Sequence, residues 1–120
     1  MTYNESILDR PQEGLDSFVW DLKDGRYVLS DTAKYKIKKI ILWILQTFDI
    51  EYFGANITGS ITSNQYVEDS DIDLHITTPI VNDDNQEELN RQLRYKFENE
   101  FKLKNENDAY IGNHPIEVYF

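Results

Sequence analysis

The stretch Asp71–Ile76 alternates polar and apolar side chains, and this alternation limits what the chain can fold into. Residues two apart in a β-strand point to the same face of the sheet. Asp71 and Asp73 therefore share one face, while Ile72 and Leu74 point toward a packed side. We expect an α/β (α+β) domain, in which helices pack on one face of a small mixed β-sheet.

Hydrophobic spacing predicts the remaining elements. Apolar residues recur at helical spacing, and runs rich in β-branched residues predict strands. The predicted helices cover about 31–48 and 85–101, and the predicted strands cover about 52–58, 71–77 and 115–120. Lys23-Asp24-Gly25 predicts a hairpin or a capped turn, and Gly112-Asn113 predicts a hairpin that leads into the last strand. Trp20 and Trp43 are expected in the core, and His114 in a turn.

The chain of 120 residues is long enough for one domain with a modest core. We predict an N-terminal extension at 1–30, partly irregular, and a core at 31–120. The sequence ends within the apolar run Ile116–Phe120, so we expect the core to be truncated at its C-terminus.

Composition excludes several classes of protein. Twenty-two acidic residues against 12 basic ones give a net charge of −10, which disfavours general nucleic-acid binding. The chain has no cysteine, which excludes disulfides and thiolate zinc sites. The longest apolar run, Ile40–Leu45, is far shorter than the roughly 20 residues of a membrane span. With no signal peptide in evidence, we expect a cytoplasmic protein without a membrane partner.

Two adjacent carboxylates on one strand face repel each other unless a cation lies between them. Asp71 and Asp73 could hold Mg²⁺, which prefers oxygen ligands. Alone, the pair is more typical of an exposed strand edge in an acidic protein. Gly59-Ser60 follows an apolar strand, where small residues let backbone amides approach a phosphate. Glu117 adds a third carboxylate within an apolar strand.

At Ile57, Gly59-Ser60, Asp71–Leu74 and Glu117, the sequence resembles the DNA polymerase β-like nucleotidyltransferase superfamily. The stretches "ITGS", "SDIDLHI" and "IEVY" look most like predicted nucleotidyltransferases of tailed bacteriophages. The resemblance implies a nucleotidyltransferase-type palm core, and a location in the host cytoplasm if a phage encodes the chain.

The resemblance also implies a reaction and its residues. Asp71 and Asp73 would bind two Mg²⁺ ions, and Glu117 would hold only the ion that activates an acceptor hydroxyl. Gly59 and Ser60 would cradle the phosphates of ATP or another nucleoside triphosphate. The expected function is Mg²⁺-dependent transfer of a nucleoside monophosphate to an unidentified hydroxyl, on an RNA end, a protein, a small molecule or a second nucleotide.

Alternatives remain open at this stage. The chain could be a catalytically inactive nucleotidyltransferase-like module for binding or regulation, or an acidic domain that binds calcium or a partner. The lysines of "KYKIKK" (34–39) could touch triphosphate or form a solvated helix face. His75 could orient a carboxylate or be structural. No basic residue lies between Thr58 and Ile80, so positive charge must come from metals or from those lysines.

Overall fold

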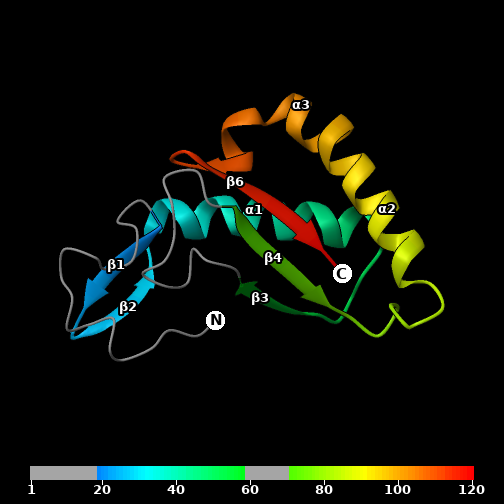
Figure 1. Ribbon diagram of the computed structural model, residues 1–120, viewed down its shortest axis with the longest axis horizontal. Coiled ribbons are helices and arrows are strands. Elements are labelled where there is room, and N and C mark those ends of the chain that lie inside the picture. The colour runs from blue at the N-terminus through cyan, green and yellow to red at the C-terminus, as the bar shows by residue number, and fades with distance from the viewer. Residues whose placement is uncertain (1–18, 59–70) are drawn as a thin grey trace.

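A mixed four-stranded sheet organises the protein, whose computed structural model describes residues 19–58 and 71–120. The spatial order is β3-β4-β6-β5 (Figure 1). The strands are β3 (Gly54–Thr58), β4 (Ile72–Thr77), β5 (Tyr110–Ile111) and β6 (His114–Tyr119). β3 and β5 run antiparallel to their neighbours, whereas β4 and β6 are parallel. The mixed sheet expected from the sequence is confirmed.

A separate hairpin precedes the first helix. It joins β1 (Trp20–Lys23) to β2 (Arg26–Leu29) in antiparallel register. Asp24 and Gly25 turn the chain with φ angles of 51° and 77°, a region that favours glycine and tolerates Asp. Of the two structures predicted for this segment, the hairpin is therefore correct.

Helix α1 (Asp31–Thr47) forms where the predicted helix 31–48 lies. Ser30 caps its start, since the hydroxyl accepts a hydrogen bond of 3.1 Å from the Ala33 amide. Ala33, Ile37, Ile40 and Ile44 are buried along one side. Their spacing of three or four residues places them on one face of the helix, against the sheet.

The predicted second helix is not one continuous α-helix. It divides into α2 (Gln86–Lys96), the π-helical turn η4 (Phe97–Phe101) and α3 (Lys102–Lys104), followed by the 3₁₀ turn η5 (Glu106–Ala109). In η4 the Lys102 amide donates to the Phe97 carbonyl, five residues earlier. The wider turn leaves the Phe97 and Phe101 rings stacked, with centroids 5.3 Å apart and planes within 11°.

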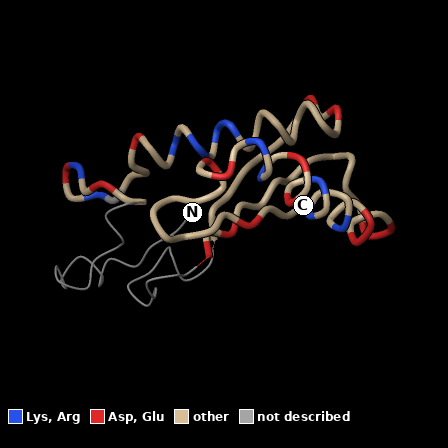
Figure 2. Tube along the Cα trace, turned by 90° about the horizontal axis from the view of Figure 1, so that it is seen from above, with Lys and Arg blue, Asp and Glu red and all other residues tan. Residues whose placement is uncertain are grey.

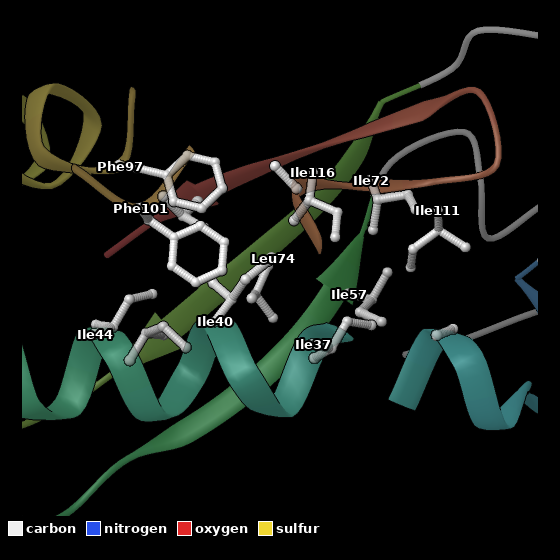
Figure 3. Packing of buried hydrophobic residues seen from close by; sticks show 14 of the residues in the cluster. Ile37, Ile40, Ile44, Ile57, Ile72, Leu74, Phe97, Phe101, Ile111 and Ile116 are labelled. Carbon is white, nitrogen blue, oxygen red and sulfur yellow. The ribbon is translucent and has the colours of Figure 1, made fainter. Parts of the chain in front are cut away.

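One hydrophobic core joins α1, the sheet and η4. Ile57, Ile72, Leu74 and Ile116 point from the strands toward α1, while the two phenylalanines enter from η4 (Figure 3). α1 lies across one face of the sheet, whereas α2 and η4 run beside β6 (Figures 1 and 2).

The structure bears on three further predictions, which concern the two tryptophans, His114 and membrane-spanning helices. Trp20 is buried, and Trp43 packs its ring against both phenylalanines of η4, so their core placement is confirmed. His114 is only 1% exposed and opens β6, so its assignment to a turn was wrong. Within the described ranges, no helix combines the length and apolar character needed to cross a membrane.

Candidate functional site

The parallel pairing of β4 and β6 brings Asp73 and Glu117 together. The two residues are direct register partners. Each lies between buried apolar neighbours, Ile72 and Leu74 in β4 and Ile116 and Val118 in β6. Since side chains alternate along a strand, both carboxylates project from the face of the sheet opposite α1. We call this the acidic face, formed by Asp73, His75, Glu117 and Tyr119.

The charges of these carboxylates interact. The pKa of Asp73 is raised above its ordinary value of 3.8, first because partial burial desolvates the carboxylate, and second because Glu117 lies beside it. His75 acts in the opposite direction. A cation between the two carboxylates would relieve this repulsion, and their oxygens are the ligands that Mg²⁺ prefers. The donor chemistry of the pair therefore fits the expected metal.

The third predicted ligand lies at the entrance to β4. Asp71 immediately precedes the strand and is exposed. In residues 19–58 and 71–120, no three His, Cys, Asp or Glu side chains are grouped as one metal ion would require. The structure thus brings Asp73 and Glu117 into register and does not gather all three carboxylates into one group.

The predicted phosphate-binding pair, Gly59 and Ser60, lies outside the described residues. The described part of β3 ends at Thr58, the register partner of Asp73. The end of β3 and the start of β4 therefore lie together. The role of Gly59 and Ser60 stays a prediction.

Tyr119 is a site residue that the sequence analysis missed. Its hydroxyl donates a hydrogen bond of 2.5 Å to Oε2 of Glu117. This bond first, then burial and the charge of Glu117, raises the pKa of Tyr119 to about 12. His75 is the register partner of Tyr119, and their ring centroids are 5.0 Å apart. The sequence could have indicated this contact, because Glu117 and Tyr119 are two residues apart in one strand and so point to the same face.

Two lysines of α1, Lys36 and Lys39, make structural contacts away from the acidic face. Lys36 Nζ donates to the Tyr110 carbonyl, and Lys39 Nζ forms an ion pair with Asp108, both at 2.7 Å. Lys39 also has a raised pKa, mainly because of its hydrogen bond to Asp108. Figure 2 shows the basic stretch of α1 as a layer separate from the strands. These two lysines connect α1 to η5 and to the first residue of β5.

The chain was compared with protein families, curated proteins and solved structures. No protein-family model, curated protein or solved structure matches the chain.

Proposed function

We propose that the protein is a Mg²⁺-dependent nucleotidyltransferase that uses a nucleoside triphosphate. The observation that carries the proposal is the register of Asp73 with Glu117 on the exposed side of a mixed sheet, with Asp71 two residues before Asp73. A fold gains no stability from two neighbouring carboxylates, whereas a cation site requires them. The resemblance of the surrounding motif to the DNA polymerase β-like superfamily supplies the reaction class.

Each residue would have a distinct task in this reaction. Asp71 and Asp73 would hold both Mg²⁺ ions, and Glu117 would hold only the ion that activates the acceptor hydroxyl, through the oxygen that does not accept from the Tyr119 hydroxyl. Bound Mg²⁺ would stabilise negative charge on the entering and leaving oxygens. The acceptor oxygen would bond to the α-phosphorus as the bond to the β-phosphate breaks. Pyrophosphate leaves with that electron pair, and the hydroxyl proton passes to water.

Thermal unfolding with each nucleoside triphosphate, with and without Mg²⁺, tests the proposal. A triphosphate at ten times its dissociation constant should stabilise the fold by about 1.4 kcal/mol, a rise of several degrees in Tm. Asp73→Asn should abolish the Mg²⁺-dependent rise. Asp24→Asn is the matched control, because it makes the same chemical change in the β1–β2 turn, and it should behave as the wild type. A rise retained in Asp73→Asn, or absent from the wild type, contradicts the proposal.

One observation favours a second candidate, a catalytically inactive nucleotidyltransferase-like module. Three carboxylates are not grouped around one position in the described part of the chain. Such a module would bind triphosphate without needing the metal. Equal stabilisation with and without Mg²⁺, unaffected by Asp73→Asn, would favour this candidate.

A further inference from the structure

A cavity of about 360 Å³ lies where α2 and η4 face β6. The helical side contributes Arg94, Phe97 and Glu98, and the strand contributes the four consecutive residues 116–119. Consecutive strand residues point to opposite faces, so all four can line one cavity only along the edge of the strand. β5 pairs with β6 only at His114 and Pro115, which leaves the following edge facing the helix.

Among the charged side chains that line this cavity, Glu98 and Glu117 each have a polar partner, whereas Arg94 has no ion pair or hydrogen bond within the described part of the chain. Lys102 forms an ion pair with Glu98, and the Tyr119 hydroxyl donates to Glu117. The Arg94 side chain makes no ion pair or hydrogen bond with the residues that the structure describes, although its charge lowers the pKa of Tyr119. Arg91, one turn earlier, forms ion pairs with Glu87 and Glu88. Arg94 is therefore the cation of the cavity that a ligand can engage.

The size and charge of the cavity indicate a class of ligand. A volume near 360 Å³ lies at the lower end of the range of about 300–1,000 Å³ for small-molecule pockets. An arginine fork binds the oxygens of a phosphate or carboxylate group. The net charge of −10 disfavours a polyanion such as RNA, because a long acceptor would be repelled over much of the surface.

We propose that this cavity is the acceptor pocket, and that it takes a small hydroxyl compound carrying one phosphate or carboxylate group. Arg94 pairs with the anionic group, and the hydroxyl points toward Glu117. The inference rests on the proposed function, since the hydroxyl oxygen is the atom that bonds to the α-phosphorus as pyrophosphate leaves. It narrows the acceptor from a polymer or protein to a small anion-bearing alcohol.

Amide NMR titrations of the ¹⁵N-labelled 120-residue chain test the pocket, with glycerol 3-phosphate, glycerate and glycerol as probes. The two anionic probes distinguish phosphate from carboxylate, and glycerol controls for the hydroxyls. We expect saturable shifts at 94–98 and 116–119 with at least one anionic probe, and none with glycerol. Arg94→Gln should weaken that binding by about tenfold, whereas the control Arg91→Gln should change it by less than about twofold.

The titrations separate this inference from the proposed function. Shifts centred elsewhere, no saturable shifts, or equal weakening by both substitutions would overturn the acceptor pocket. Arg94→Gln should keep the Mg²⁺-dependent stabilisation by triphosphate, because it removes no metal ligand. If triphosphate stabilises the wild type while the cavity binds no probe, the pocket alone is wrong. If the cavity binds a probe and no triphosphate stabilises the protein, the proposed reaction is wrong and the acceptor role with it.

Discussion

The two faces of the sheet are built from alternate residues of the same strands, yet they have opposite effects on stability. In β4, Ile72, Leu74 and Ile76 are at most 1% exposed and pack into the core. Between them, Asp73 and His75 belong to the acidic face, where Asp73 is held beside another carboxylate. One set of side chains drives folding, while the other includes a repulsion that folding must overcome. The repulsion between Asp73 and Glu117 is unfavourable for folding, and a cation bound at the proposed site would relieve it.

The largest expected effect comes from the packed face. Leu74→Ala should lower the free energy of unfolding by about 2–5 kcal/mol, because it removes a buried side chain and leaves a cavity. Urea denaturation measures the loss. His75→Ala, one residue further along β4 on the acidic face, is the control and should change stability by less than about 1 kcal/mol. Equal losses would mean that the two faces do not differ as described.

A smaller effect of opposite sign is expected at Asp73. Asp73→Asn should raise Tm by about 1–5 °C, because like charges on paired strands destabilise a sheet by up to about 1 kcal/mol. The raised pKa means that the folded state holds this proton more tightly than the unfolded state. Wild-type stability should therefore fall as pH rises from near the ordinary pKa of 3.8 through the raised value.

The difference between Asp73→Asn and the wild type should accordingly be largest at neutral pH and shrink below pH 3.8. Thermal melts across this range measure it. A variant less stable than the wild type at neutral pH would show that Asp73 stabilises the fold. The two faces of the sheet would then not have opposite effects on stability at this residue.

The smallest effect is expected at Tyr119. Tyr119→Phe removes only the hydroxyl that holds Glu117, and should cost at most about 1 kcal/mol of stability because the bond is partly exposed. The pKa is raised in the folded state, so this contribution is complete below pH 10.0 and is lost as pH rises toward about 12. Unfolding free energies of variant and wild type should therefore converge in alkali. A loss of unfolding free energy as large as that of Leu74→Ala would show that Tyr119 contributes to stability as much as the residues of the packed face.

The helices and strands could be predicted from the sequence because each depends on residues that lie close together in the chain. Ser30 and the apolar spacing behind it fix α1, and alternation fixes β4 together with the face to which Asp73 points. The register of Asp73 with Glu117 could be expected only through the resemblance, because strand pairing depends on contacts distant in sequence. Arg94 was missed for the same reason, since only the packing of α2 beside β6 brings it near Glu117.

The π turn was missed for a different reason. Leu89, Leu93, Phe97 and Phe101 are spaced by four, and this spacing is compatible with an α-helix as well as with one wider turn. The π pattern shows in the bond from the Lys102 amide to the Phe97 carbonyl, five residues earlier.

The wider turn at η4 has a consequence for the evolutionary history of the chain. A π turn contains one residue more than an α turn, so a single-residue insertion can produce it inside an existing helix. Homologues that diverged before such an insertion would have a gap between Phe97 and Phe101, where alignments normally forbid one. An ungapped alignment would then shift the downstream sequence by one position. Glu117 would then be aligned with a residue that points to the opposite face of the sheet. The carboxylate that pairs in register with Asp73 would be overlooked.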